Sequence, residues 1–484
     1  MTASSAAVRR VAVIGGGISG LAAAHRLREL DPAVEVTLFE RSERLGGVLR
    51  TTRAQGYLIE HGADSFITNL PWGVDLCRRL GIDGQLLGTN PLGRRALVLH
   101  RGRTYPVPEA FVLMQPKKVW PIITTPLLSW RAKLRLLGEW FVPAKQTSED
   151  ESLQSFVTRR LGREAFERLV QPLVAGIYTA DAAKLSLAAT MPQFLEMERK
   201  QGGLLRATFR QAWRGSSQTK KTEDNAAHGA RYGLFVTPRE GLASLIDALA
   251  ARLPAGCVQL NTSVESVAPT SDRRWQVAIA GLPAETFDAV VIALPAPVAA
   301  RLTSGFDAEL AQSLGSIEYA GAIVALVGCR RDQLTHPLYG FGFVIPEVER
   351  RQILSVSFSS QKFADRAPAE HVLLRVFLGG GMHPEILELA DDEVRQIVER
   401  ELRELLGWSG QHDLFQIQRW TGVMPQYHLG HLDRVAQIEQ RTSAWPGLAL
   451  AGNAYRGVGI PQCIRSGEQA AERILKSSAR SAVP

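Results

Sequence analysis

A glycine motif near the start of the chain, between an apolar strand and an alanine-rich helix, constrains the fold more than any other feature. Gly15, Gly17 and Gly20 form G-x-G-x-x-G within VRRVAVIGGGISGLAAAHRLREL, and the next strand, VEVTLFE, ends at Glu40. The first glycine allows a tight turn, the second lets backbone approach a pyrophosphate, and the third lets helix and strand pack closely. The helix N-terminus offers N–H groups to the phosphates. This βαβ unit predicts a parallel sheet that binds a dinucleotide, with Glu40 on a ribose hydroxyl.

A second basic and glycine-rich turn, RSERLGG, follows Glu40 and includes Arg44. A simple NAD-binding sheet has no need for it, whereas a longer ligand would cross the sheet and leave its far half over this loop. The turn therefore favours FAD over NAD, and the alternative is a routine surface turn. The candidate cofactor contacts in these two stretches are Gly15, Gly16, Gly17, Ile18, Ser19, Gly20, Glu40, Arg41, Arg44, Gly46 and Gly47.

The composition limits the possible functions. The 484 residues are 45% hydrophobic and 21% charged, which excludes a globally disordered chain. The net charge of +8 fits an anionic ligand or an anionic membrane surface. No basic run is interleaved with aromatic residues, so nucleic acid is not expected as a partner. The four cysteines lie too far apart for a zinc or redox motif, and we expect reduced buried thiols and no metal site: Cys77, Cys257, Cys329 and Cys463.

The middle of the chain changes in character. Residues 106–145 mix large apolar and basic residues, and Trp130, Leu134, Leu137 and Phe141 recur at helical spacing. This pattern predicts either a helical surface that rests on a membrane interface or an ordinary packing helix. The longest uncharged apolar run is too short to span a bilayer, and the N-terminus has no apolar signal-peptide region. We therefore expect neither a transmembrane helix nor a secretory signal.

Several stretches spread over nearly the whole chain carry a family resemblance. The chain resembles the glutathione-reductase-type flavoproteins, in the branch of amine oxidases, phytoene desaturases and protoporphyrinogen oxidases. Within that branch it is similar to the oxygen-dependent protoporphyrinogen/coproporphyrinogen oxidase family. The matching stretches are VAVIGGGISGLAAAHRL, LFERSERLGGVLRT, GYLIEHGADSF, LVQPLVAGIYTADAAKLSLAATMP, GLFVTPREGLASL, HPLYGFGFVIP and LAGNAYRGVGIPQCIRSGEQAA.

The resemblance implies a fold of mixed α/β and α+β class. A discontinuous glutathione-reductase-type FAD-binding Rossmann domain is expected from residues 1–90, 232–300 and 443–484. A β-rich substrate domain would comprise residues 91–105 and 301–442. Residues 106–206 would form a helical insertion at a membrane interface or a substrate channel, and the polar residues 207–231 a flexible loop.

The resemblance also implies cofactor contacts outside the glycine motif. In the family the C-terminal glycine stretch returns to the flavin domain, where Gly457 and Gly459 would let backbone lie close to the isoalloxazine ring. The helix that follows would point its N-terminus at the ring and stabilise negative charge on the reduced flavin. The contacts carried over are Gly62, Ala63, Asp64, Ser65, Val264, Trp420, Asn453, Val458, Gly459 and Ile460.

The activity implied is the six-electron oxidation of a porphyrinogen to the porphyrin in haem biosynthesis, with non-covalent FAD, O2 as acceptor and H2O2 as product. The chemistry is centred on the flavin, so no catalytic acid or base is assigned. The candidate substrate contacts are Gly176, which would admit the ring, Phe377, which would lie against it, and Arg95, which would pair with a propionate. Their ordinary alternatives are a helix-breaking glycine, a core aromatic and a solvated arginine. The substrate is coproporphyrinogen III or protoporphyrinogen IX, and the stretches around Gly62 and Gly176 are closer to bacterial coproporphyrinogen-oxidising members.

Two other classes of function stay open. An amine or polyamine oxidase of the same branch would hold a lysine near the flavin, but only Lys362 and Lys476 follow Lys221, and neither has a comparable strand context. The other class is a non-catalytic flavin-binding or membrane-scaffold protein. The candidate partners are the porphyrinogen, O2, the next haem-pathway enzyme, ferrochelatase, and a peripheral membrane contact. The expected location is the cytoplasm or the inner membrane face.

Overall fold

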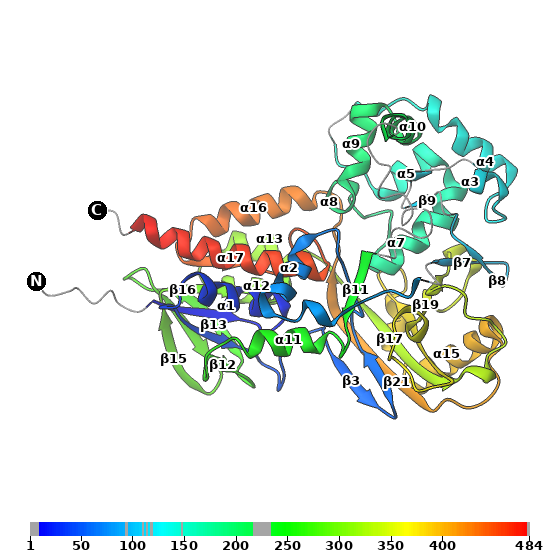
Figure 1. Cartoon of the computed structure of the whole chain (residues 1–484). Helices are drawn as coiled ribbons and strands as arrows, with labels where there is room; N and C mark the ends of the chain where they lie inside the picture. The colour runs from blue at the N-terminus through cyan, green and yellow to red at the C-terminus, as the bar shows by residue number, and fades with distance from the viewer. Residues whose placement is uncertain are drawn as a thin grey trace, which may run out of the picture.

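A computed structural model of the chain describes residues 9–91, 95–108, 111–112, 115–116, 120–146, 149–215 and 234–481. Two large sheets organise the molecule, one parallel and one mainly antiparallel, with a cluster of helices beyond the second (Figure 1). This confirms the predicted mixed α/β and α+β fold class, with a Rossmann unit and a β-rich unit.

The parallel sheet has five strands, which come from distant parts of the chain. Their spatial order is β12 (Val258–Gln259), β2 (Glu35–Phe39), β1 (Arg10–Ile14), β16 (Ala289–Ile292) and β22 (Leu448–Leu450). All neighbouring pairs are parallel. The central strands are apolar runs, as expected for strands covered on both faces. The sheet is therefore complete only when the C-terminal segment returns and adds strand β22 to its edge.

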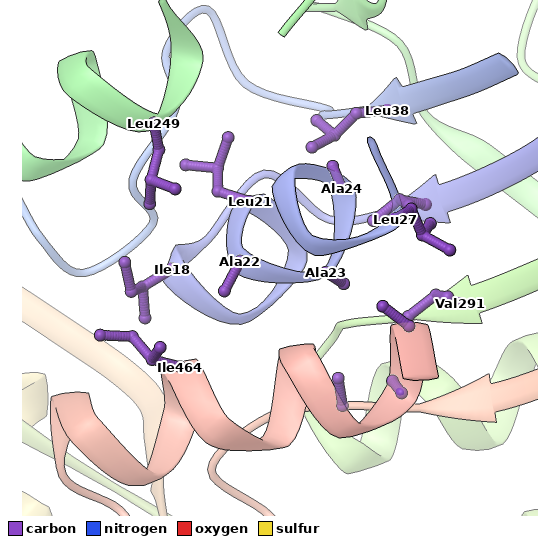
Figure 2. Packing of buried hydrophobic residues seen from close by; sticks show 14 of the residues in the cluster. Ile18, Leu21, Ala22, Ala23, Ala24, Leu27, Leu38, Leu249, Val291 and Ile464 are labelled. Carbon is purple, nitrogen blue, oxygen red and sulfur yellow. The ribbon is translucent and has the colours of Figure 1, made fainter. Parts of the chain in front are cut away.

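Helix α1 (Ile18–Leu30) is the centre of the core on one face of this sheet. It lies between Leu249 of α11 (Ala243–Ala250) and Ile464 of α17 (Ile460–Ser481) (Figure 2). Three consecutive alanines, 22–24, let the neighbouring helices approach. The approach is closest at Gly467 of α17, where a Cβ would lie 2.1 Å from the Ser19 carbonyl oxygen. The C-terminal helix is thus fixed directly against the helix that follows the glycine motif.

The second sheet has seven strands, and the helix α15 (Asp391–Leu406) packs on one of its faces. The strands in spatial order are β21 (Leu414–Pro425), β17 (Tyr319–Arg330), β20 (His371–Gly379), β19 (Ser355–Phe358), β18 (Gly342–Val344), β7 (Leu97–His100) and β8 (Arg103–Pro106). On this face, the buried strand residues Val376 and Val356 belong to one apolar core with Val394 and Val398 of α15. The alternate residues of the same strands, such as Phe377, point to the opposite face.

The helical cluster comprises α3 (Trp120–Thr124), α4 (Trp130–Leu137), η3 (Gly138–Phe141), α5 (Leu153–Leu161), α6 (Arg163–Ala165), η4 (Phe166–Val170), α7 (Gln171–Tyr178), α8 (Leu187–Thr190), α9 (Pro192–Gln201) and α10 (Leu204–Gly215). The expectation of helix from residue 106 was wrong at 111–112 and 115–116, where β9 (Phe111–Val112) pairs with β10 (Gln115–Pro116). Pro116 accounts for part of the difference, because proline disfavours helix at the residue before it, here Gln115.

The predicted loop over residues 207–231 was also wrong at its start, since α10 continues to Gly215. Glu139 is the reason, because its carboxylate accepts hydrogen bonds from the N–H groups of Leu204 (2.8 Å) and Leu205 (3.0 Å) at the start of α10. Such a cap stabilises a helix through a partner distant in sequence. The part of the predicted loop at 216–231 lies outside the described residues.

The remaining elements connect these units. They are β3 (Thr51–Ala54), β4 (Tyr57–Glu60), β5 (Phe66–Ile67), α2 (Pro71–Leu80), η1 (Asp83–Gln85), β6 (Leu86–Gly88), β11 (Phe235–Pro238), β13 (Val264–Pro269), β14 (Trp275–Ile279), β15 (Leu282–Phe287), α12 (Ala296–Thr303), α13 (Ala308–Gly315), η7 (Arg331–Gln333), η8 (Glu347–Glu349), α14 (Ser359–Lys362), η9 (Pro384–Glu388) and α16 (His431–Ser443). Among the helices in the described ranges, none combines the length and apolar character needed to cross a bilayer.

Candidate active site

The glycine motif forms the turn between β1 and α1. Gly15 has φ of +108°, and a Cβ there would lie 2.5 Å from the Ala293 carbonyl oxygen. A Cβ on Gly20 would lie 1.9 Å from the Gly15 carbonyl oxygen, so only glycine permits this helix–strand contact. A Cβ on Gly17, in contrast, would have no heavy atom within 4 Å. The helix α1 begins next to it with Ile18 and Ser19, and no side chain caps this N-terminus. The turn therefore offers unobstructed backbone N–H groups, which fit a dinucleotide pyrophosphate.

Glu40 lies at the end of β2 and joins three segments. Its Oε2 accepts a hydrogen bond from the Gly16 N–H at 2.7 Å, and its Oε1 accepts from the Ser42 N–H and hydroxyl. Its backbone carbonyl accepts from Thr262, which leads into β13 at Val264. The structure thus brings Glu40 and Val264 to the same end of the sheet, where the adenosine half of the cofactor would bind.

The second glycine turn lies directly against the first. The Gly46 N–H donates to the Gly16 carbonyl oxygen at 2.8 Å, and a Cβ on Gly47 would lie 3.5 Å from the Gly17 Cα. The Arg44 guanidinium donates to backbone carbonyls of this same turn, including that of Leu45 at 3.0 Å. Arg44 therefore shapes the turn, while Arg41 beside it is exposed to solvent.

Residues 61–65 form a loop that is held from the second sheet; we call it the HGADS loop. The Trp420 indole N–H donates to the His61 carbonyl oxygen at 2.7 Å, and Arg375 donates to that of Gly62. Ala63 packs on the apolar core beneath the Rossmann sheet. These contacts fasten a predicted flavin-binding loop of one unit to strands β20 and β21 of the other.

Asp64 in the HGADS loop is paired with two cations. Lys362 Nζ lies 2.9 Å from Asp64 Oδ1 and 3.0 Å from Ser65 Oγ, and Arg375 Nη1 lies 3.1 Å from Asp64 Oδ2. Burial alone would raise the pKa of Asp64, but Lys362 and Arg375 outweigh it and hold that pKa well below its usual value. The cluster of two cations and one carboxylate keeps a net positive charge beside the loop.

The C-terminal glycine stretch is clamped by Tyr427. The Tyr427 hydroxyl donates to the Asn453 carbonyl oxygen at 2.6 Å and accepts from the Gly457 N–H at 2.7 Å. Its ring stacks on His431, with centroids 3.9 Å apart, and His431 Nε2 donates to the Tyr455 carbonyl oxygen at 3.0 Å. Burial lowers the pKa of His431 to about 4, so the imidazole is neutral at neutral pH.

The Tyr427 clamp holds in position the residues that the family resemblance assigns to the flavin ring. Gly457 has φ of +123°, Val458 and Gly459 follow, and α17 begins at Ile460. The Asn453 side chain donates to the Val423 carbonyl oxygen at 3.1 Å, so it braces the stretch on β21. The structure thus directs the α17 N-terminus to the end of the stretch, where its partial positive charge would face the ligand.

The three candidate substrate residues lie along the second sheet. Phe377, Ser355 and Val344 are cross-strand partners in one row, so their side chains share the face opposite α15. A Cβ on Gly176 of α7 would meet Val344 at 3.7 Å and no closer atom, so the helix faces that row through a residue without a side chain. Arg95 is exposed beside the start of β7, and its carbonyl oxygen accepts from the Phe341 N–H at 3.0 Å. The structure thus brings Gly176 and Phe377 to one face and places Arg95 towards its edge.

Sequence reasoning missed the clamps around these loops. Arg375 had one usable signal, because in HVLLRVFLG it stands two residues from Phe377 and therefore on the same face. Lys362 was set aside because of its sequence context, yet it ends α14, the short helix after β19, and reaches the HGADS loop. Tyr427 and His431 carried no local signal, since their partners come from another part of the chain.

Comparisons with known proteins agree with this architecture. The family model "Flavin containing amine oxidoreductase" matches residues 18–475. The chain is 31% identical to a coproporphyrinogen III oxidase of Bacillus subtilis, over 96% of this chain and 98% of the relative. It is 34% identical to a coproporphyrinogen III oxidase of Propionibacterium freudenreichii, over 96% and 90%.

A solved structure covers almost the whole fold. The crystal structure of a protein from Exiguobacterium, described as a candidate protoporphyrinogen oxidase, superposes with a TM-score of 0.84 at 28% identity, over 98% of this chain and 99% of that one. The resemblance found in the sequence is thereby confirmed, and so are an oxidoreductase function and FAD as the cofactor. The chain belongs to the family of flavin containing amine oxidoreductases.

Proposed function

We propose that this chain oxidises a porphyrinogen to the porphyrin in haem biosynthesis, with non-covalently bound FAD, O2 as acceptor and H2O2 as product. The observation that carries the proposal is the sheet face shared by Phe377 and Arg375. Phe377 offers an apolar surface opposite the gap that Gly176 leaves in α7, while Arg375 on the same strand reaches the HGADS loop. A flat, apolar ring bound on this face would lie beside the cofactor.

FAD, when bound, supplies the acceptance of two electrons at a time, so three rounds are needed for each porphyrin. The protein supplies binding and orientation. Gly17 and the N-terminus of α1 would hold the pyrophosphate, and Glu40 the ribose. The N-terminus of α17 and the cations Lys362 and Arg375 would favour the reduced, negatively charged ring. No residue is assigned as a general acid or base.

Of the two porphyrinogens, we propose coproporphyrinogen III as the substrate. Both bacterial relatives described above carry this activity in their names. This substrate has four propionates, whereas protoporphyrinogen IX has two, so it requires more cationic groups at the rim. Exposed Arg95, at the edge of the Phe377 face, is suited to pair with one of them.

The second candidate, an amine oxidase, is favoured by one observation, the unexpected position of Lys362. Its ammonium group, however, contacts the Asp64 carboxylate and the Ser65 hydroxyl, and lies over the rings of Phe235 (5.4 Å) and Phe363 (5.1 Å). A lysine held in this way is poorly placed to position a water molecule. A non-catalytic flavin-binding protein, the remaining class, would release no peroxide with any substrate.

We also propose a peripheral membrane contact through α4, η3 and α10, in line with a location in the cytoplasm or on the inner membrane face. Trp130 is 69% exposed, Phe141 is 82% exposed, and Phe209 stacks edge-on against Trp140 at 5.9 Å. Exposed Arg131 adds positive charge, as expected for a surface that meets anionic lipid. Flotation with anionic vesicles should recover the wild type and not a Trp130→Ser/Phe141→Ser double variant. A contact with ferrochelatase remains a prediction of the resemblance.

The peroxide released per porphyrin tests the proposed function. The purified protein should form coproporphyrin III from coproporphyrinogen III and release three H2O2 for each porphyrin, and it should release none with putrescine or benzylamine. Peroxide release with an amine, and none with either porphyrinogen, would establish the amine oxidase instead. The non-enzymatic oxidation of porphyrinogen must be subtracted by using protein from which FAD has been removed.

A further inference from the structure

A cavity of about 390 Å³ lies between α16 and α17, next to the edge strand β22. Its lining includes none of the residues assigned to FAD or to the porphyrinogen. In Figure 1, α16 and α17 lie along the Rossmann unit, and one end of α16 reaches α8 of the helical cluster. A cavity of this size falls within the range of about 300–1,000 Å³ that small-molecule sites occupy.

The charge lining the cavity is mainly positive. Arg456, Arg465 and Arg473 line it, together with one carboxylate, Glu439. Arg456 is paired with Glu439 through two hydrogen bonds, at 2.7 and 2.6 Å, so these two charges compensate each other. Arg465 and Arg473 remain, and they are the groups that can attract an anion.

Neither remaining arginine is well paired among the described residues. Arg465 lies 3.6 Å from Glu472 and 4.0 Å from Glu468, and each of these carboxylates already pairs with another arginine, Glu472 with Arg26 and Glu468 with Arg79. Arg473 forms no ion pair within the described ranges. The two residues stand eight positions apart on α17, which separates their Cα atoms by about 12 Å along the helix axis. A ligand that met both would carry more than one anionic group.

Two polar atoms of residues that line the cavity have no hydrogen-bond partner in the described part of the chain: the Tyr455 hydroxyl and Gln462 Oε1. Both atoms are closed to solvent, so neither meets a ligand in the cavity. Gln462 Oε1 lies instead against the C-terminal glycine stretch, because a Cβ on Gly459 would be 2.5 Å from it. The groups left to hold an anion in the cavity are therefore Arg465 and Arg473.

We propose that this cavity binds a small polyanion with two or more carboxylate or phosphate groups, held by Arg465 and Arg473. The site is coupled to the flavin-binding stretch through Gln462. A Cβ on Gly457 would lie 2.6 Å from Gln462 Cγ, and one on Gly459 would lie 2.5 Å from Gln462 Oε1, so this side chain packs directly on the stretch. A ligand that reorients Gln462 therefore changes the surroundings of the flavin.

Calorimetric titration of the FAD-loaded protein tests the site, with citrate, pyrophosphate and inorganic phosphate as probes and sodium chloride at equal ionic strength as the control. One equivalent of citrate or pyrophosphate should bind, more tightly than phosphate, and should shift the visible flavin spectrum. Tighter citrate identifies a carboxylate ligand and tighter pyrophosphate a phosphate ligand; either result supports the site. Full FAD occupancy, checked by absorbance, keeps the probes out of the pyrophosphate turn.

Two variants locate the binding. Arg473→Gln and Arg465→Gln should each weaken it about tenfold. Arg163→Gln is the matched control, since it removes an exposed guanidinium from the helical cluster and should leave the affinity unchanged. Absence of binding by all three probes, or equal weakening by Arg163→Gln, overturns the proposal. Porphyrinogen turnover takes no part in these measurements, so they are independent of the proposed function.

Discussion

Arg375 of β20 donates a hydrogen bond to the Gly62 carbonyl oxygen and forms an ion pair with Asp64 at 3.1 Å. Two residues further along the strand, Phe377 lies on the same face, and the Arg375 guanidinium is 5.1 Å from the centre of its ring. One strand thus contacts both the predicted flavin loop and the predicted substrate surface. This pairing links the two units of the fold at the site where electrons would pass.

Replacement of Arg375 by methionine should damage this link. Of its two cationic partners the buried Asp64 would keep Lys362 alone, and loss of one member of a buried ion pair typically destabilises a protein by about 3–5 kcal/mol. We expect a lower unfolding temperature and weaker FAD retention on gel filtration. Arg330→Met is the matched control, because its partner Asp332 is exposed and such a pair contributes about 0–1 kcal/mol. Equal effects of the two variants would contradict this role for Arg375.

Gly17→Val should abolish FAD binding without unfolding the protein. An added Cβ at Gly17 has no heavy atom within 4 Å, so the valine should obstruct a ligand at the turn rather than the fold. The purified variant should be colourless while its circular dichroism stays close to that of the wild type. Gly84→Val is the control, since Gly84 also has no heavy atom within 4 Å of an added Cβ, and it should stay yellow. A yellow Gly17→Val protein would show that the pyrophosphate binds elsewhere.

Stability should depend on pH through His431. Its pKa is lowered to about 4 in the folded protein, mainly by burial, so the folded state resists protonation that the unfolded state accepts near pH 6.5. This contribution to stability is present above pH 6.5 and is lost as the pH falls towards 4. Its slope is at most about 1.4 kcal/mol per pH unit.

His431→Gln should therefore lose less stability than the wild type between pH 6.5 and 4, even if it is less stable at neutral pH. His61, whose pKa burial also lowers to about 4, acts in the same direction and is unchanged in this variant. Glu60, whose pKa burial raises to about 7, acts in the opposite direction and is likewise unchanged. Urea unfolding at a series of pH values measures the difference, and identical slopes would exclude His431 as the source.

How much of this could be read from the sequence depends on the range of each interaction. The turn at Gly15–Gly20 and the partnership with Glu40 follow from local spacing, because neighbouring residues make those contacts. The clamp by Tyr427, and the ion pairs of Asp64 with Lys362 and Arg375, join segments far apart in the sequence, so no local pattern predicts them. The continuation of α10 beyond residue 206 was missed for the same reason, since the residue that caps this helix, Glu139, lies in another helix.

Gly176→Leu should reduce porphyrinogen turnover at least tenfold while FAD occupancy stays intact. The new side chain would project past Val344 towards the Phe377 face, where the substrate ring is proposed to bind. Arg95→Ala should instead raise KM with a smaller effect on kcat, because it removes a proposed propionate contact at the rim. Gly305→Leu is the control for Gly176, because an added Cβ at Gly305 has no heavy atom within 4 Å. Unchanged kinetics in both test variants would move the substrate site away from this face.

The most direct measurement of the central claim is anaerobic reduction of the bound FAD by each porphyrinogen, followed as bleaching of the flavin absorbance in a stopped-flow instrument. We predict rapid bleaching by coproporphyrinogen III, slower bleaching by protoporphyrinogen IX, and return of the colour when O2 is admitted. Faster bleaching by protoporphyrinogen IX would reverse the choice of substrate. An absence of bleaching with both compounds would contradict the proposal that this protein is a porphyrinogen oxidase.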